Sequence, residues 1–197
     1  MLRSGPLYTP AWVHRLRRNV ASHLGDHRFV CLSDTEIAGV ETIPLQHGWP
    51  GWWSIIECFR PGLFHGRVLY LDLADLVVKS LDPFFDGEGF RIARAPLVPP
   101  PTHGRFASGL MAFDAGDTEI YDRFAPRADE VMKRLHGDQE WIEEVRPTAA
   151  TFDQGLTAGF RGECVAGPPK DARVIFVHGR PKPHEITADW FRELWDA

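Results

Sequence analysis

Residues 67–78 read RVLYLDLADLVV, and this stretch constrains the fold more than any other part of the chain. After Arg67, its apolar and β-branched residues are typical of a strand that is buried in a sheet. Two carboxylates, Asp72 and Asp75, follow directly. Unpaired buried charge is costly, so either a cation binds these carboxylates or the strand ends in solvent. The stretch by itself leaves both interpretations open.

Segments typical of strands alternate with segments typical of helices along the 197 residues. Thr9-Pro10 resembles a helix start, and apolar residues recur at helical spacing from there to Leu24. Further strands are expected at residues 27–34, 41–46, 90–95, 110–115 and 172–179, and helices at 48–59, 117–135, 137–145 and 187–195. This alternation predicts an α/β fold with a mostly parallel sheet and helices on both faces. No linker interrupts the pattern, so a single domain over residues 1–197 is expected.

Composition argues against several classes of protein. The net charge is −5, from 22 basic and 27 acidic residues, whereas a nucleic-acid binder usually carries a basic stripe. No apolar run approaches the ~18 residues of a membrane span, and no apolar region of a signal peptide follows the basic N-terminus. The cysteines, Cys31, Cys58 and Cys164, are widely spaced, which favours buried thiols in a reducing compartment. We therefore expect a cytoplasmic protein with no transmembrane segment and no nucleic-acid partner.

Polar side chains follow several of the predicted strands. Asp72 and Asp75 follow RVLYL, Asp114 follows LMAF, and the imidazole of His178 follows RVIFV. In open α/β sheets, ligands bind outside the carboxyl ends of the strands. Two carboxylates and one imidazole suit Mn²⁺ or Mg²⁺ and leave coordination positions for substrate oxygens. A single carboxylate at a strand end more often caps a turn, so each residue taken alone favours a structural role.

The segment VHGRPKPHE follows the last predicted strand and has the composition of an anion-binding loop. Gly179 permits close approach of a ligand to the backbone. Arg180 and Lys182 bring positive charge to the same strand end, and two prolines stiffen the loop. Such a loop suits a diphosphate that lies next to a metal ion. The alternative is a solvated basic turn.

Four motifs occur in order along the chain: GRVLYLDLADLVVKSLDPFF, FASGLMAFDA, HGDQEWI and HGRPKPHE. Together they resemble the motif series of GT-A-fold glycosyltransferases, nearest the retaining family eight and its bacterial relatives. The resemblance runs from Tyr8 to Glu185. It implies a metal-dependent enzyme that moves a sugar from a nucleotide-sugar donor, usually a UDP-sugar, to an acceptor, with retention at the anomeric carbon.

The resemblance also implies how the donor's diphosphate is held. In the family, an Asp-x-Asp motif and a distant His bind Mn²⁺ (or Mg²⁺), and this metal bridges the diphosphate. Carried over to this sequence, Asp72 and His178 are metal ligands. Gly179 and Lys182 match the residues that contact the diphosphate.

Further residues match positions that face the donor sugar, the acceptor or the base. Asp138 and Gln139 match a catalytic Asp-Gln pair that faces the sugar and the acceptor. Ser108 and Gly109 match the end of an Asn-Ser-Gly turn beside the donor sugar. Tyr8 matches the end of the segment that holds the nucleotide base.

The sequence departs from the family's pattern in the metal motif. Ala74 stands in the position of the second metal-binding Asp, and Asp75 follows one residue later. On a regular strand Asp75 would point to the opposite face from Ala74. A bulge or turn at Leu73-Ala74 would return Asp75 to the site as a metal ligand. Without such a turn, the metal site has lost a ligand.

Other departures lie outside the metal motif. Ala107 replaces the Asn beside the donor sugar, and Ile55 stands where relatives often carry Lys. Relatives also open with a strand, whereas this chain begins directly before its first helix. An incomplete sheet would leave backbone groups unpaired, so we expect reduced stability or self-association through the open edge.

These departures leave two alternatives to the metal-dependent glycosyltransferase. One is a catalytically degenerate glycosyltransferase-like protein that binds or has a structural role, because a fold can outlive its chemistry. The other is a metal phosphoesterase that uses Asp72, Asp75 and His178, which leaves the Ser-Gly, Asp-Gln and Lys-Pro motifs unexplained. The donor sugar and the acceptor are not encoded in any motif, although the proline-rich loop at 96–105 is placed to shape one of their sites.

Overall fold

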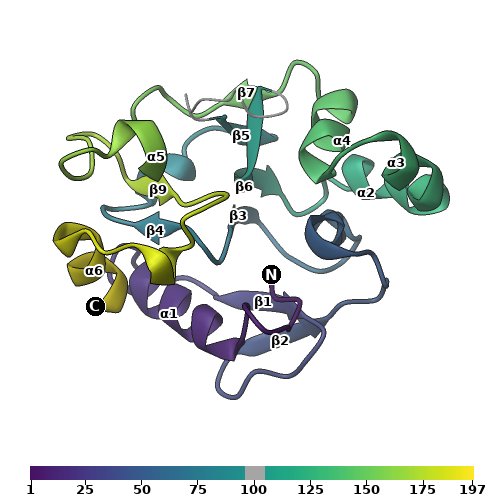
Figure 1. Cartoon of the computed structure of the whole chain (residues 1–197). Helices are drawn as coiled ribbons and strands as arrows, with labels where there is room; N and C mark the ends of the chain where they lie inside the picture. The colour runs from purple at the N-terminus through teal and green to yellow at the C-terminus, as the bar shows by residue number, and fades with distance from the viewer. Residues whose placement is uncertain (96–104) are drawn as a thin grey trace.

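The computed structural model describes residues 1–95 and 105–197, so most of the proline-rich loop lies outside the described residues. The α-helices are α1 Pro10–Ala21, α2 Glu119–Phe124, α3 Ala128–Arg134, α4 Asp138–Val145, α5 Phe160–Glu163 and α6 Asp189–Asp196 (Figure 1). The 3-10 helices are η1 Gly51–Phe59, η2 Asp82–Phe84, η3 Ala125–Arg127 and η4 Pro183–Glu185. The strands are β1 Val30–Ser33, β2 Glu41–Pro44, β3 Arg67–Leu71, β4 Leu76–Val77, β5 Arg91–Arg94, β6 Phe106–Asp114, β7 Ala150–Thr151, β8 Thr157–Gly159 and β9 Val174–Phe176.

In the described part of the chain, the strands form sheets with the orders β1-β2, β3-β6-β5-β7 and β4-β9-β8. The pairs β1–β2, β5–β7 and β8–β9 are parallel, whereas β3–β6, β5–β6 and β4–β9 are antiparallel. The α/β class is confirmed, but the expectation of mostly parallel pairing is wrong. Only residues 95–105 separate β5 from β6, fewer than the dozen or more residues that a parallel crossover needs.

Strand β6 lies at the centre of the largest sheet and is buried on both faces. Met111 and Phe113 belong to an apolar cluster that helices α2, α3 and α4 cover. The alternate residues Leu110 and Ala112 belong to a second cluster, which contains the buried side of α1. Because successive side chains of a strand point to opposite faces, β6 separates these clusters. Helices therefore flank both faces, as the sequence predicted.

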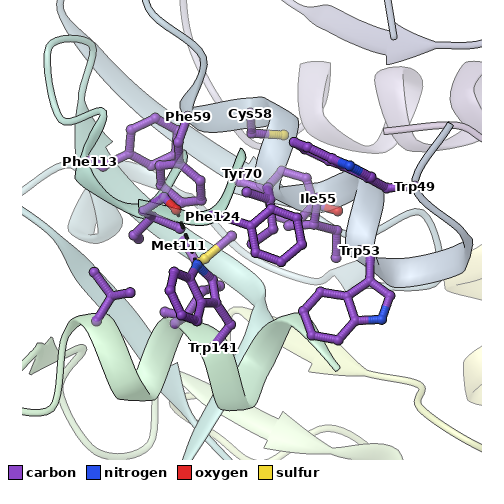
Figure 2. Packing of buried hydrophobic residues seen from close by; sticks show 14 of the residues in the cluster. Trp49, Trp53, Ile55, Cys58, Phe59, Tyr70, Met111, Phe113, Phe124 and Trp141 are labelled. Atoms are coloured by element: carbon purple, nitrogen blue, oxygen red, sulfur yellow. Dashed lines mark hydrogen bonds between the residues drawn. The ribbon is translucent and has the colours of Figure 1, made fainter. Parts of the chain in front are cut away.

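The aromatic residues between Trp49 and Phe59 mostly form core (Figure 2). Trp49 and Trp53 are buried and pack against Phe124. Trp141 packs against Phe124 from α4 and donates its indole N–H to the carbonyl of Ile120 at 3.1 Å. A buried Trp needs such an acceptor, so this contact anchors α4 to α2.

Cys31, Cys58 and Cys164 are buried free thiols, as predicted. Helix α1 begins at Pro10, but Thr9 makes no side-chain capping bond. Ile55 is a buried core residue. None of the described helices has the length and apolarity needed to cross a membrane.

Candidate functional site

The chain turns between β3 and β4, and this turn brings Asp75 back to Asp72. The Asp75 amide donates to the Asp72 carbonyl at 3.2 Å, and the Asp72 amide lies 3.3 Å from Oδ2 of Asp75. Oδ1 of Asp72 accepts from the Ala74 amide at 2.9 Å, which is a typical Asx-type contact. The two carboxylates therefore lie within one turn. Of the two geometries that the sequence left open, the structure has the turn at Leu73-Ala74.

Asp75 is the more buried of the two carboxylates, with 3% of its surface exposed. Burial, and after it the neighbouring charge of Asp72, raises the pKa of Asp75 well above its usual value. The backbone of the same turn is held by Arg15, which donates to the carbonyls of Leu73 at 2.7 Å and Asp75 at 2.8 Å. A carboxylate pair in this setting holds a proton or a further cation.

Arg15 is a site residue that the sequence analysis missed. It lies on α1, and its guanidinium stacks 3.5 Å from the ring centroid of Trp195 on α6. Burial lowers the pKa of Arg15 to about 9, although the charges of Asp75 and Asp72 oppose this shift. Nothing in the local pattern marks Arg15, because its partners lie about 60 residues away in sequence.

Ser108 and Gly109 face the turn from within β6, and the predicted turn at these residues is wrong. Ile92 of β5 pairs with Met111, whereas the next residue, Ala93, pairs with Ala107. Residues 108–110 of β6 therefore form a bulge, which re-aims the strand locally. The Gly109 carbonyl accepts from the Asp72 amide at 2.8 Å, so the bulge lies directly against the two carboxylates.

Asp138 begins α4 and lies beside this bulge. Burial raises the pKa of Asp138 to about 7, the hydrogen bond from the Ser108 side chain opposes the shift, and the charge of Asp72 adds to it. Its Oδ2 is buried without a hydrogen-bond partner among the described residues. Gly137, not Asp138, is the N-cap of α4. Oδ2 of Asp138 is thus a candidate contact for a ligand.

Gln139 and Tyr70 lie close to these carboxylates. Oε1 of Gln139 lies 3.4 Å from the Ser108 amide, so the Asp-Gln and Ser-Gly motifs are brought together. Burial raises the pKa of Tyr70 well above its usual value, and the charges of Asp72, Asp138 and Asp75 raise it further. Asp72, Asp75 and Asp138 therefore all lie close enough to the Tyr70 hydroxyl for their charges to raise its pKa. We refer to these three carboxylates as the acidic cluster.

Residues 178–182, which follow β9, form a second part of the site that we refer to as the cationic loop. Nε2 of His178 is buried without a partner among the described residues. Burial, and after it the charges of Arg161 and Lys182, lowers the pKa of His178, so the imidazole is neutral at pH 7. Lys182 Nζ donates to the hydroxyl of Tyr8 at 3.3 Å, which joins two predicted ligand contacts from opposite ends of the chain.

Gly179 adopts φ 71°, a left-handed conformation that favours glycine. A Cβ at this position would lie 3.2 Å from the guanidinium of Arg161, so this arginine lies directly over the loop. The sequence analysis missed Arg161, which belongs to α5. It reaches the loop because α5 directly follows β8, and β8 pairs with β9.

The pairing of β4 with β9 directs the cationic loop toward the acidic cluster. β4 directly follows the Asp72–Asp75 turn and pairs antiparallel with β9, with Leu76 opposite Ile175. The chain that leaves β9 therefore runs back toward the turn that precedes β4. In residues 1–95 and 105–197, however, no three His, Cys, Asp or Glu side chains are grouped closely enough to hold a metal ion.

The donor types nevertheless suit a divalent cation. Asp72 and Asp75 supply adjacent carboxylates, and His178 has an unpartnered ring nitrogen, which are ligands that Mn²⁺ accepts. The assignment of Asp72, Asp75 and His178 to one metal ion stays a prediction. Asp114 does not belong to this group: it forms an ion pair with Arg67 at 3.2 Å, at the other end of β3. Because β6 runs antiparallel to β3, the carboxyl end of β6 lies far along β3 from Asp72.

Trp52 is the exposed aromatic residue of this region. It is 52% exposed, and its indole N–H donates to the His136 carbonyl at 3.2 Å, next to the start of α4. A Cβ on Gly137 would lie 2.8 Å from the indole nitrogen, so the ring covers the residue that precedes Asp138.

Gly109→Ala tests whether a cation uses the space beside the two carboxylates. A Cβ there would lie 3.4 Å from Oδ2 of Asp75 and 3.6 Å from Cβ of Asp72. We expect the variant to fold normally and to bind Mn²⁺ roughly tenfold more weakly in calorimetry, because the methyl group narrows the approach. Gly116→Ala, where a Cβ meets nothing within 4 Å, is the control. If both variants bind Mn²⁺ as tightly as the unmodified protein does, the assignment of Asp72 and Asp75 as metal ligands is contradicted.

No family model and no curated protein sequence matches the chain. Solved structures do. The galactosyltransferase LgtC, crystallised with donor and acceptor sugar analogues, matches with a TM-score of 0.68 and 14% identity, over 95% of this chain and 91% of LgtC. The glycosyltransferase GlyE of Streptococcus pneumoniae TIGR4 matches with a TM-score of 0.68 and 14% identity, over 93% of this chain but 56% of GlyE.

A glycosyltransferase involved in glycosylation of the major capsid of PBCV-1 is more distant. It matches with a TM-score of 0.54 and 12% identity, over 99% of this chain and 97% of that chain. At these identities the similarity establishes the fold. The chain has the GT-A-like fold of these glycosyltransferases, as the resemblance of its motifs predicted.

Proposed function

We propose that this protein is a glycosyltransferase that moves a sugar from a nucleotide-sugar donor, preferably a UDP-sugar, to the hydroxyl group of an acceptor. One observation carries the proposal: the acidic cluster, in which Asp75 and Asp138 are buried, and the cationic loop lie at neighbouring strand ends of a fold shared with LgtC and GlyE. Ligands of open α/β sheets bind at such strand ends. The fold alone is compatible with other functions, so the site residues carry the assignment.

The cationic loop is suited to the donor's diphosphate. Lys182 and Arg161 supply positive charge around the neutral imidazole of His178, and Gly179 keeps the backbone accessible. An ammonium and a guanidinium form charge-assisted hydrogen bonds with phosphate oxygens. Tyr8, which contacts Lys182, would meet the nucleoside part of the same ligand.

Asp72 and Asp75, together with His178, are the residues that would hold Mn²⁺ or Mg²⁺. When bound, the metal would act as a Lewis acid that stabilises the negative charge of the leaving diphosphate. The protein's own contribution is to fix the two carboxylates in one turn and to hold that turn through Arg15. Proton release is expected on metal binding, because Asp75 must ionise in order to ligate.

The proposed reaction breaks the bond between the anomeric carbon and the donor phosphate oxygen, and the electron pair stays on the phosphate. The acceptor oxygen forms the new bond to the anomeric carbon, and its proton passes to the leaving phosphate oxygen. With retention, both events take place on the same face of the sugar. Asp138 would bind sugar hydroxyls through its unpartnered oxygen, and Gln139, held near Ser108, would orient the sugar for attack.

Lys182→Gln tests the diphosphate assignment. We expect UDP to bind the unmodified protein only with Mn²⁺ present, and the variant to bind UDP roughly tenfold more weakly because one charge-assisted contact is lost. Titration calorimetry with and without Mn²⁺ measures both effects. Lys133→Gln, on the exposed face of α3, is the matched control.

Repeating the Lys182→Gln titration with UMP distinguishes a diphosphate contact from a general loss of affinity. The effect should shrink with UMP, which lacks the second phosphate. Equal weakening for UDP and UMP would contradict the assignment of Lys182. Release of sugar from a UDP-sugar, followed by NMR of the product's anomeric proton, then tests transfer and retention.

A catalytically degenerate binding protein is the second candidate, and one observation favours it. The described residues hold no ready three-ligand metal group, whereas Arg15 already places a cation at the Asp72–Asp75 turn. This candidate predicts nucleotide affinity that does not depend on metal, and no sugar release from any donor. The calorimetric experiment with and without Mn²⁺ therefore separates the two functions.

A further inference from the structure

Side chains of α1 bind the carbonyl groups along one edge of residues 73–77. Arg15 donates through Nη2 to the carbonyls of Leu73 at 2.7 Å and Asp75 at 2.8 Å. Asn19 donates to the Val77 carbonyl at 2.9 Å and accepts from the Val77 amide at 2.8 Å. Residues four positions apart lie on the same face of a helix, so one face of α1 holds both the Asp72–Asp75 turn and the strand that follows it.

The two sides of the Asp72–Asp75 turn are held by different groups. The carboxylates hold the amide side: Oδ1 of Asp72 accepts from the Ala74 amide at 2.9 Å, and Oδ2 of Asp75 lies 3.3 Å from the Asp72 amide. A cation that binds the carboxylates draws on these same oxygens and so weakens their bonds to the amides. The contacts of Arg15 lie on the carbonyl side and use none of these oxygens. They can therefore keep the shape of the turn while the carboxylates hold a cation.

The guanidinium of Arg15 is itself fixed by Trp195. Helices α1 and α6 lie side by side, and Cζ of Arg15 lies 3.5 Å from the centroid of the Trp195 ring (Figure 1). Both side chains are 8% exposed. Nε and Nη1 of Arg15 are buried and have no hydrogen-bond partner among the described residues. The face of the indole is thus the main contact of this part of the guanidinium, and such a contact strengthens where water is excluded.

The indole of Trp195 has a fixed orientation as well. Trp12 of α1 packs edge-on against it, with ring centroids 5.6 Å apart, and Phe191 of α6 stacks on it at the same centroid distance. A rotation of the Trp195 ring would disturb both contacts. The direction in which Arg15 points therefore depends on α6, the helix that follows the cationic loop and η4.

We propose that Arg15 and Trp195 are positioning residues of the donor site: Trp195 orients the Arg15 guanidinium, which fixes the carbonyls of the Asp72–Asp75 turn so that both carboxylates face one divalent cation. This inference rests on the proposed function, because that function assigns the cation to the turn. Neither residue touches the cation. The contribution of Trp195 reaches the site only through Arg15.

Trp195→Leu tests the proposal, because it leaves every charge of the site in place. We expect the full chain with this substitution to bind Mn²⁺ alone about tenfold more weakly in calorimetry, at a temperature at which melting shows the variant to be folded. Trp195→Phe keeps an aromatic face and should recover most of the affinity. Trp190→Leu is the matched control on the same helix: its ring packs against Phe160, and its loss should leave Mn²⁺ affinity unchanged.

The sign of the effect of Arg15→Met separates positioning from charge. Removal of a positive charge beside two carboxylates would by itself tighten the binding of a cation. Positioning predicts the opposite, a loss of at least about tenfold in Mn²⁺ affinity. Arg15→Lys keeps the charge but lacks the planar guanidinium, so its affinity should lie between those of Arg15→Met and the unmodified protein. Arg18→Met removes an exposed charge from the same helix and is the control.

The double variant tests whether Trp195 acts through Arg15. In the Arg15→Met background, Trp195→Leu should weaken Mn²⁺ binding by less than about twofold, because the residue that it orients is already absent. Fully additive losses would overturn the proposal. If Arg15→Met does not fold, the same comparison is made with Arg15→Lys.

Hydrogen exchange of the metal-free protein gives a readout that does not depend on the proposed function. The amides of Ala74 and Asp75 should exchange at least about tenfold faster in Trp195→Leu and in Arg15→Lys, whereas the amide of Phe113 in β6 should be unchanged. If the unmodified protein binds no Mn²⁺, the metal assignment fails and exchange alone decides whether these residues position the turn. Unchanged exchange of the Ala74 and Asp75 amides in both variants would overturn the proposal. So would equal or tighter Mn²⁺ binding by Arg15→Met.

Discussion

Asp75→Asn is expected to remove Mn²⁺-dependent binding of UDP while the protein stays folded. Asn preserves the size of the buried side chain but cannot supply a negative charge to a cation. In the unliganded protein, burial raises the pKa of Asp75 and so favours its neutral carboxyl group, which an amide resembles closely. We expect a loss of at least about 100-fold in Mn²⁺-dependent affinity. Calorimetry of UDP with Mn²⁺, together with thermal melting, measures both effects.

Two comparisons make the Asp75→Asn result specific. Asp86→Asn, at an exposed position, should leave UDP binding unchanged. In the unmodified protein, UDP and Mn²⁺ should bind more tightly as the pH rises from 5 to 8, because the cation must displace a proton from the Asp72–Asp75 pair. If Asp75→Asn is silent while Asp72→Asn abolishes binding, then Asp75 is a structural residue of the turn and not the displaced partner of Asp72.

Asp138→Asn is expected to change how stability depends on pH. The pKa of Asp138 is about 7 in the folded protein, above its usual value of 3.8. A raised folded-state pKa contributes stability that is fully present below about pH 4 and is lost as the pH rises through 7. The shift of about three pH units corresponds to about 4 kcal/mol at most. The unmodified protein should therefore lose stability between pH 4 and pH 8, and Asp138→Asn should lose clearly less.

Urea unfolding at pH 5 and pH 8 measures this difference. Asp75 contributes in the same direction, so the decisive quantity is the difference between the variant and the unmodified protein. Asp153→Asn, at an exposed position, is the control. An identical pH dependence in Asp138→Asn would show that the Asp138 carboxyl is not held in a desolvated site. Turnover, if Asp138 binds the donor sugar as proposed, should fall in the same variant even at pH 5.

The strands and helices with strong local signals follow from the sequence. β3 and β9 are apolar and β-branched, and α1 shows a regular helical spacing after Pro10. These features depend on residues within a few positions of one another. Short strands such as β4 and β7, with two residues each, carry too little pattern to be predicted. They form because their backbones hydrogen-bond to a neighbouring strand.

The residues of the candidate site also fall into those that the sequence identifies and those that only the tertiary structure places. The motifs identified Asp72, Asp138 and His178 as residues with chemistry, and the departure at Ala74 raised the question of where Asp75 points. Only the tertiary structure decided that the chain turns there and that Ser108–Gly109 is a bulge rather than a turn. Local preference allows both outcomes, and the pairing of β3 with β6 selects between them.

The sequence by itself determined the α/β class, the order of the main elements and the kinds of side chain available to a ligand. The tertiary structure decided the mixed pairing of the sheets, the contacts of Arg15 and Arg161, and the exclusion of Asp114 from the site. The physical reason is the sequence separation over which each kind of interaction acts. Propensity and periodicity act over a few residues, whereas the contacts of Arg15 with Leu73 and of Lys182 with Tyr8 join residues 58 and 174 positions apart, which only the folded chain brings together.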